Sequence, residues 1–100
     1  RNPMVTIEMN YPVLPGKGEA FVTECNEVIR AMQEEEGHSS SHVYQDVNEE
    51  GSYLIVSEWE SRDAFDAFLR SEAFRSKMTS WGEAEILAGR PRHQYLSPQG

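Results

Sequence analysis

The chain has 100 residues, of which 38% are hydrophobic and 26% are charged, and its net charge at pH 7 is −8. This length predicts a single domain over residues 1–100, with its folded core at about 4–96. The negative charge argues against nucleic acid and anionic lipid surfaces as partners, because both would be repelled. No membrane span or N-terminal signal peptide is expected, since no apolar run approaches the roughly 20 residues that a bilayer requires.

The first third of the chain changes from a strand pattern to a helix pattern. Residues 4–13 predict a strand, because apolar and polar side chains alternate. Its apolar face consists of Val5, Ile7, Met9 and Tyr11, and its other face of Thr6, Glu8 and Asn10. Apolar residues at helical spacing predict a helix over about 17–35, followed by Gly37 in a left-handed conformation. Cys25, the single cysteine, lies on the helix's apolar stripe and is interpreted as a small core residue of a cytoplasmic protein.

The middle of the chain predicts an antiparallel hairpin. Residues 38–47 form the second expected strand, and residues 48–51 form a connection that contains a glycine. The third strand, over residues 53–59, has apolar side chains on both faces: Tyr53, Ile55 and Trp59 face one way, and Leu54 and Val56 face the other. Such a strand needs cover on both sides.

The last third predicts a helical region and a short strand. Ser61 is a suitable N-cap for a helix with the stripe Ala64, Phe65, Phe68 and Leu69. Ser71 caps a further turn that bears Phe74, Met78 and Trp81 and ends at Gly82. Residues 92–97 supply a last short strand.

The order of the expected elements predicts an α+β, ferredoxin-like fold with a four-stranded antiparallel sheet. This order is βαββαβ, that is, strand, helix, strand, strand, helix and strand. Two helices would cover one face of this sheet. The other face would remain bare, and it is more apolar than soluble monomers tolerate. We therefore expect a homodimer in which two sheets pack face to face.

Several segments together resemble the antibiotic biosynthesis monooxygenase family of dimeric α/β barrels. They are Pro15-Gly16-Lys17 before a helix with Phe21, Gly37 before the second strand, Val56 to Ser61 with Ala64-Phe65, and Ser71 to Phe74. The resemblance covers roughly residues 4–96. Members of this family include cofactor-free monooxygenases that act on polyketide anthrones or quinols, heme-degrading oxygenases, an isomerase of a signalling molecule and proteins of no assigned activity. The resemblance therefore implies the fold and does not specify one reaction.

The heme-degrading branch resembles this chain in its first strand and in the segment after Trp59. That branch uses an Asn on the first strand, a Trp in the second helix and a His at the end of that helix. Asn10 lies close to the first position, but Phe68 and Met78 occupy the other two. The resemblance therefore implies heme as an alternative only, with His38, His42 and His93 as further nitrogen donors.

The candidate site residues combine apolar side chains with a few polar ones. The expected catalytic residues are Asn10, which would polarise a substrate oxygen if its strand face lies under the helices, and His42 or His93 as a base. The expected substrate-binding residues are Trp59, Phe68, Met78, Trp81 and Arg90. Each also has a structural interpretation, as core side chain or solvated edge. No metal site is expected, because two histidines four residues apart on a strand make a weak metal signal.

We expect a monooxygenase without a bound cofactor that acts on a small aromatic, quinol or polyketide-type substrate. The substrate would lose a proton and react as a carbanion with dioxygen. The alternatives are a heme-binding or heme-degrading monooxygenase with a non-standard site, and a non-catalytic dimeric ligand-binding protein.

Overall fold

The computed structural model describes residues 4–96, apart from the side chain of Glu83. The elements follow the predicted order, with the second helical region divided into two helices. They are β1 (Val5–Pro12), α1 (Gly18–Gln33), β2 (His38–Gln45), β3 (Ser52–Trp59), α2 (Arg62–Leu69), α3 (Glu72–Glu83) and β4 (Arg92–Leu96). The predicted ferredoxin-like α+β class is confirmed.

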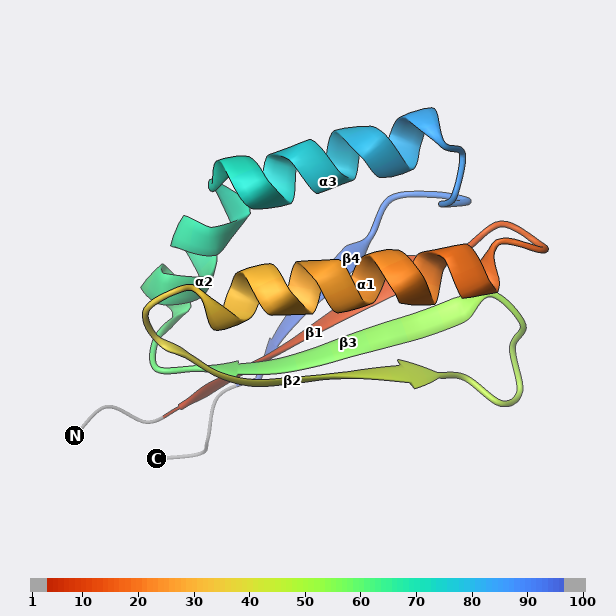
Figure 1. Cartoon of the computed structure of the whole chain (residues 1–100). Coiled ribbons are helices and arrows are strands. Elements are labelled where there is room, and N and C mark those ends of the chain that lie inside the picture. Colours follow the sequence, from red (N-terminus) through yellow and green to blue (C-terminus); the bar gives the residue numbers. More distant parts are fainter. Residues whose placement is uncertain (1–3, 97–100) are drawn as a thin grey trace.

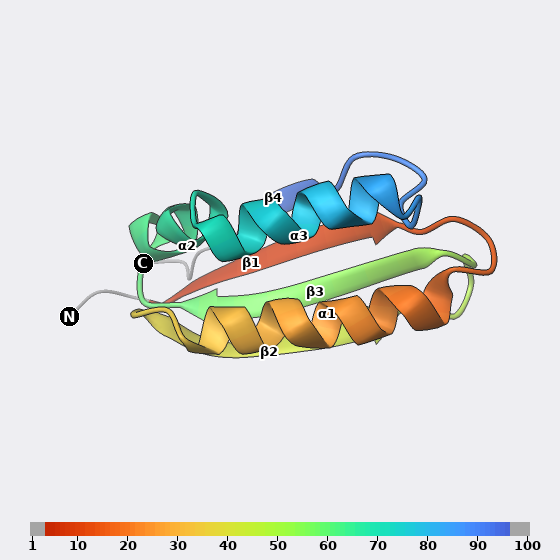
Figure 2. The same cartoon turned by 45° about the horizontal axis from the view of Figure 1, so that its top comes forward.

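The four strands form one antiparallel sheet in the order β2-β3-β1-β4. All three helices lie on the same side of it (Figure 1), and α1 runs above β2 and β3 while α3 runs above β1 (Figure 2). We call this side the helix face and the other side the open face. Within residues 4–96, no element covers the open face, and no helix is long and apolar enough to cross a membrane.

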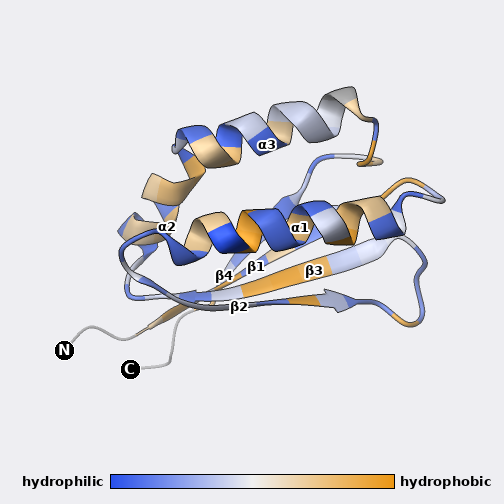
Figure 3. Ribbon diagram, in the orientation of Figure 1, coloured by the Kyte–Doolittle hydropathy of each residue, from blue (hydrophilic) through white to orange (hydrophobic). Residues whose placement is uncertain are grey.

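The alternation of side chains along each strand decides which residues reach the core. On β1, Ile7, Met9 and Tyr11 point to the helix face and are fully buried. The central apolar stretch of β3, visible in Figure 3, is divided between the faces. Ile55 is fully buried under the helices, whereas its neighbours Leu54 and Val56 are only partly buried on the open face. The predicted two apolar faces of this strand are confirmed.

Serine caps divide the helical region after β3. Ser61 Oγ accepts a hydrogen bond from the Ala64 N–H at 3.1 Å, and Ser71 Oγ accepts one from the Phe74 N–H at 3.2 Å. Each bond satisfies a backbone donor that the first turn of a helix leaves free. The helix that begins after Ser71 is therefore a separate element, α3, as its cap predicts.

The end of α3 differs from the expectation that Gly82 terminates it. The helix continues through Glu83, and the Ile86 N–H donates to the Trp81 carbonyl at 3.2 Å. Glu85 occupies the left-handed position of this closing turn, with φ of 55°. Gly37 does adopt the expected left-handed conformation, with φ of 95°.

Two aromatic clusters fill the space between helices and sheet. Trp81 of α3 packs against Tyr11 and Phe21, with ring centroids 5.7 and 5.3 Å away. Trp59 packs at the other end against Phe65 and Phe68. Cys25 is fully buried, and its burial raises the pKa of the thiol to about 12, so it is a core residue as expected.

Candidate functional site

A groove of about 610 Å³ opens between α3, the segment that follows α3, and β4. Its volume lies within the range of about 300 to 1,000 Å³ that is usual for small-molecule sites. We call it the α3–β4 groove, and the described residues that line it are Phe74, Met78, Gly82, Leu87, Ala88, Gly89, Arg90, Pro91 and His93.

One wall of the groove is a face of α3. Phe74, Met78 and Gly82 are spaced four residues apart, so they lie above one another along the helix. A Cβ atom added at Gly82 would meet no atom within 4 Å. The wall is therefore apolar at the end with Phe74 and Met78, and open at the other end, because Gly82 has no side chain.

A polar contact fixes α3 to α1. Lys77 Nζ donates to Glu24 Oε1 at 2.9 Å and also pairs with Glu27. The Trp81 indole N–H donates to the same Glu24 oxygen at 3.3 Å. Hydrogen bonds from both residues lower the pKa of the Glu24 carboxyl, with the Lys77 bond as the largest cause. We call Glu24, Glu27, Lys77 and Trp81 the α1–α3 clamp, and it holds the groove's helical wall in place.

The opposite wall is the segment between α3 and β4, which folds back onto the end of β1. The Leu14 N–H donates to the Ile86 carbonyl, and the Ala88 N–H donates to the Pro12 carbonyl, both at 2.8 Å. Leu87 forms an isolated β-bridge with Val13. Because backbone hydrogen bonds hold this segment to the sheet, both sides of the groove have anchored walls.

His93 supplies the groove with a proton acceptor. It is paired with Met9 in the register of β4 and β1, so its side chain lies on the helix face. Its ring packs edge-on against Phe65, with centroids 6.0 Å apart. His93 is exposed overall, but partial burial of its imidazole desolvates the ring and lowers its pKa below the usual value. The ring is therefore neutral near pH 7 and can accept a proton.

Arg90 supplies the groove with a permanent positive charge. It is an exposed residue of the segment before β4. The salt bridges found among residues 4–96 join other residues, namely Arg62 with Asp66 and Lys77 with Glu24 and Glu27. The guanidinium group can therefore pair with an anionic group that enters the groove.

Three predicted substrate-binding residues lie in the core instead of at the groove surface. Trp59, Phe68 and Trp81 are all fully buried. The Trp59 indole N–H donates to Ser57 Oγ at 3.0 Å, which satisfies it inside the protein. The Phe68 ring lies 5.3 Å from the Phe74 ring and so supports the groove from behind. Close packing under the helices leaves none of these three a free surface, which corrects their expected contact with substrate.

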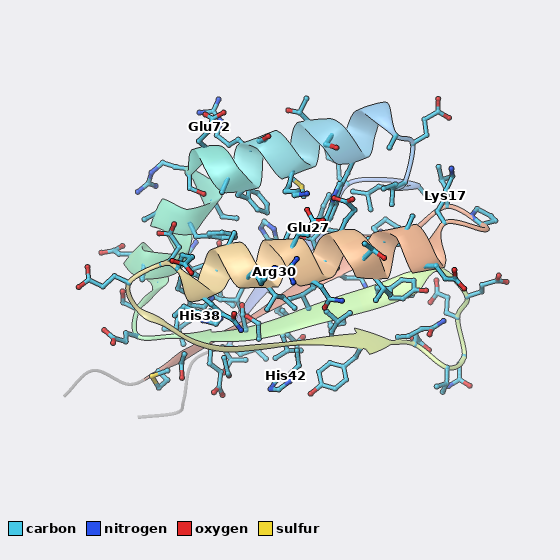
Figure 4. The ribbon with its side chains drawn as sticks, viewed as in Figure 1. Lys17, Glu27, Arg30, His38, His42 and Glu72 are labelled. Carbon is cyan, nitrogen blue, oxygen red and sulfur yellow. The ribbon has the colours of Figure 1, made fainter. Side chains whose placement is uncertain are left out.

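Two predicted catalytic residues, Asn10 and His42, lie on the open face. The helix face of β1 is occupied by Met9 and Tyr11, so Asn10 points the other way, and the expected polar pocket under the helices does not form. The Asn10 amide donates to Ser52 Oγ and to the Tyr53 carbonyl, each at 3.2 Å. His42 is exposed and points away from the helices (Figure 4). The His93 side chain lies on the helix face, opposite to those of Asn10 and His42. His93 also borders a shallow hollow on the open face that Asn10, Glu8 and Arg92 line.

Residues 4–78 of the chain match the family described as antibiotic biosynthesis monooxygenase. The chain belongs to this family. The resemblance inferred from the sequence is thus confirmed, and the groove is a site on an antibiotic biosynthesis monooxygenase fold. The family match includes Phe74 and Met78 but ends before Arg90 and His93, so the second wall of the groove lies beyond it.

Three comparisons place the chain among known proteins. It is 36% identical over 92 residues to "Putative heme-binding protein NP_2262A" of Natronomonas pharaonis, a match that covers 92% of this chain but 15% of that protein. A putative antibiotic biosynthesis monooxygenase from Bordetella bronchiseptica superposes with a TM-score of 0.87 at 18% identity, covering 98% of this chain and 99% of the other. SnoaB from Streptomyces nogalater, a cofactor-independent oxygenase, superposes with a TM-score of 0.80 at 17% identity, covering 98% and 95%. At these identities the two structures establish the shared fold.

The far wall of the groove is the part that sequence reasoning missed. Gly89 and Pro91 indicate a loop, but nothing in their pattern shows that the segment returns to the end of β1. Leu87 likewise has no periodic partner in the sequence. Among the residues that the structure describes, no group of three or more His, Cys, Asp or Glu side chains could hold a metal ion.

Proposed function

We propose that this chain is a cofactor-independent monooxygenase that oxidises a small aromatic or quinol-type substrate in the α3–β4 groove. The observation that carries the proposal is the neutral imidazole of His93 in an apolar groove of about 610 Å³. Membership of the antibiotic biosynthesis monooxygenase family supports it, as does the shared fold with the cofactor-independent oxygenase SnoaB.

The chemistry requires a base, a dry surface and stabilisation of negative charge. His93 would take a proton from an activated carbon of the substrate and leave a carbanion. The carbanion would give electrons to dioxygen and form a carbon–oxygen bond, and loss of water from the resulting hydroperoxide would leave a carbonyl group. Arg90 would stabilise the negative charge that develops in the first step, and the apolar wall with Phe74 and Met78 would exclude water.

The test uses anthrone, which gains one oxygen atom and releases one water for each dioxygen consumed as it becomes anthraquinone. The wild-type protein should accelerate both oxygen uptake and anthraquinone formation. His93→Gln should lower the rate about 100-fold or more, because positioned bases typically contribute that much. His42→Gln is the matched control, since it changes the same residue type on the open face and should retain the rate. Equal rates for the two variants would reject the role of His93. Binding without oxidation would favour the non-catalytic alternative.

Heme binding is a second candidate, favoured by two groove residues that could serve as iron ligands. His93 offers an imidazole nitrogen and Met78 a thioether sulfur, and Arg90 could pair with a propionate. Bound heme would supply oxygen activation at its iron. The name of the Natronomonas relative is consistent with this candidate, although the match covers 15% of that protein. A shift of the heme Soret band that His93→Ala abolishes would support it, and an unshifted band at stoichiometric heme would remove it.

We also propose that a second copy of the chain covers the open face. Leu54 and Val56 of β3 lie near the centre of that face, and the exposed side chains of Tyr44 and Leu96 lie on its edge strands. Accessible apolar side chains spread over one sheet face favour contact with another protein surface. Two sheets packed in this way would complete the dimeric barrel that the family resemblance implies.

A further inference from the structure

The α3–β4 groove differs in charge from the chain as a whole. The protein contains 17 acidic and nine basic residues, with a net charge of −8. Among the described side chains that line the groove, none is a carboxylate. Arg90 contributes a permanent positive charge there, and His93 is neutral near pH 7 because desolvation lowers its pKa. The groove is therefore a locally cationic site on an anionic protein.

The fold creates this charge by separating two neighbouring arginines. Arg92 is paired with Asn10 in the register of β4 and β1, so it lies on the open face. Arg90 lies two residues earlier, before β4 begins, and lines the groove on the helix face. A single guanidinium group thus stands next to a wall of apolar side chains.

This combination selects a ligand with two properties. Phe74 and Met78 favour a flat aromatic body, since aromatic rings and thioethers pack well against other rings. Arg90 favours a carboxylate, because a guanidinium group can form two parallel charge-assisted hydrogen bonds with it. A neutral ligand would leave Arg90 without a partner, and the general field of the protein would repel an anion that Arg90 did not hold.

We infer that the α3–β4 groove binds a flat aromatic acid, with its carboxylate on Arg90 and its rings against Phe74 and Met78. The inference rests on the proposed function and narrows the substrate class of that same site. A ligand bound in this way would share the groove with the imidazole of His93, which also lines it.

The experiment compares 2-naphthoate with 2-naphthamide by isothermal titration calorimetry. The two probes have the same ring system and differ in charge. The wild-type protein should bind the naphthoate roughly tenfold more tightly than the naphthamide. This ratio is at the low end for hydrogen bonds to charged groups, because Arg90 is exposed to water. Arg90→Gln should abolish this preference and leave the naphthamide affinity unchanged.

Two further variants test whether the two probes bind in the α3–β4 groove. Arg75→Gln makes the same change in net charge on another surface of α3, next to Glu72 and Thr79, and should keep the preference. Gly82→Leu should weaken both probes, because its side chain would enter the open end of the groove, where a Cβ meets nothing within 4 Å. A thermal unfolding midpoint for Gly82→Leu that is not lower than wild type would show that the fold is intact.

Equal affinities for the two probes, or no binding of either at millimolar concentration, would overturn the inference. An Arg75→Gln effect as large as that of Arg90→Gln would also overturn it, since the general field would then account for the preference. None of these measurements needs turnover. Failure of anthrone oxidation with the naphthoate preference intact would therefore reject the proposed function alone, and the reverse result would reject the ligand class alone.

Discussion

The two faces of the sheet are built from the same strands but are completed in different ways. On the helix face, Ile7, Ile55 and Trp59 are fully buried under helices of the same chain. On the open face, Leu54 and Val56 remain partly accessible although they are equally apolar. The difference shows that the helices of this chain close one side of its four-stranded sheet and leave apolar side chains on the other side partly accessible.

The groove lies at an edge of the helix face, where this closure is incomplete. α1 and α3 are joined by the α1–α3 clamp, but α3 and the edge strand β4 are not packed tightly together. We propose that a small molecule binds in the space between them. The open face lies on the other side of the sheet, where we propose that a second copy of the chain packs.

The largest expected effect is a difference in the loss of stability when two neighbouring residues on opposite faces of the sheet are replaced by alanine. Ile55→Ala should lower the free energy of unfolding by about 2 to 5 kcal/mol, because it leaves a cavity in a closed core. Val56→Ala should cost clearly less, since this side chain is only partly buried. Urea denaturation at a protein concentration low enough to favour monomers measures both. Equal costs there would mean that the two faces are not different within one chain.

The next effect concerns what covers the open face. Val56→Glu places a charge at the centre of the proposed interface, where burial without a partner is costly. Light scattering should then give the 11.4 kDa mass of one chain, compared with twice that mass for wild type. A wild-type protein that is monomeric at micromolar concentration would contradict the proposed dimer. An unchanged far-ultraviolet circular dichroism spectrum would confirm that the variant is folded.

A pH profile tests the neutral base in the groove. Only unprotonated His93 can accept a proton, and desolvation lowers its pKa below 6.5. The value of kcat/KM for anthrone oxidation should therefore fall on the acidic side, with the midpoint of that fall below pH 6.5. An acidic limb centred above pH 6.5 would show that a different group, or a more solvated histidine, acts as the base.

A smaller effect tests how the helix face is held together. Lys77→Met should lower the free energy of unfolding by about 1 kcal/mol or less, since the clamp is only partly shielded from water. The Glu24 pKa is lowered in the folded state, so this contribution is present above the unfolded pKa of about 4.5 and is lost as pH falls through the folded value. The difference between variant and wild type should thus shrink at acidic pH. Asp66→Asn, in the exposed pair with Arg62 at 3.9 Å, should have no comparable effect.

The smallest effect concerns the turn that begins the far wall of the groove. Glu85 has φ of 55°, a conformation that glycine adopts without steric cost. Glu85→Gly should raise the free energy of unfolding by about 0.5 to 1 kcal/mol, as measured by the thermal midpoint. Ser80→Gly, at an exposed position within α3, should lower the free energy of unfolding instead. A loss of stability in Glu85→Gly would indicate that the Glu85 side chain contributes an interaction of its own.

The sequence predicts the fold well because the fold depends on local signals. Strict alternation in β1, the serine caps Ser61 and Ser71, and Gly37 each act over a few residues, and the structure confirms all of them. The two-faced character of β3 is also readable from Leu54 to Val56 without any tertiary information.

The site is predicted less completely because it depends on long-range placement. Periodicity shows that Asn10 and Met9 lie on opposite faces, but not which of the two faces the helices cover. It also cannot show that Phe68 is in the core while Met78, ten residues later, lines a groove. Phe68 is covered by Trp59 and Phe74, whereas Met78 faces the segment that returns to the end of β1, and both contacts are long-range or depend on how the helices are placed.

The register of β1 with β4 also determines where the fold can be joined to other chains. Thr6 is paired with Leu96, so the first and last described strands begin and end next to each other. The groove's far wall folds against Pro12 and Val13, at the other end of β1. Such a module can be attached to or inserted into a longer protein without obstructing its groove. The Natronomonas relative, in which the matched part is 15% of the length, is an arrangement that this geometry permits.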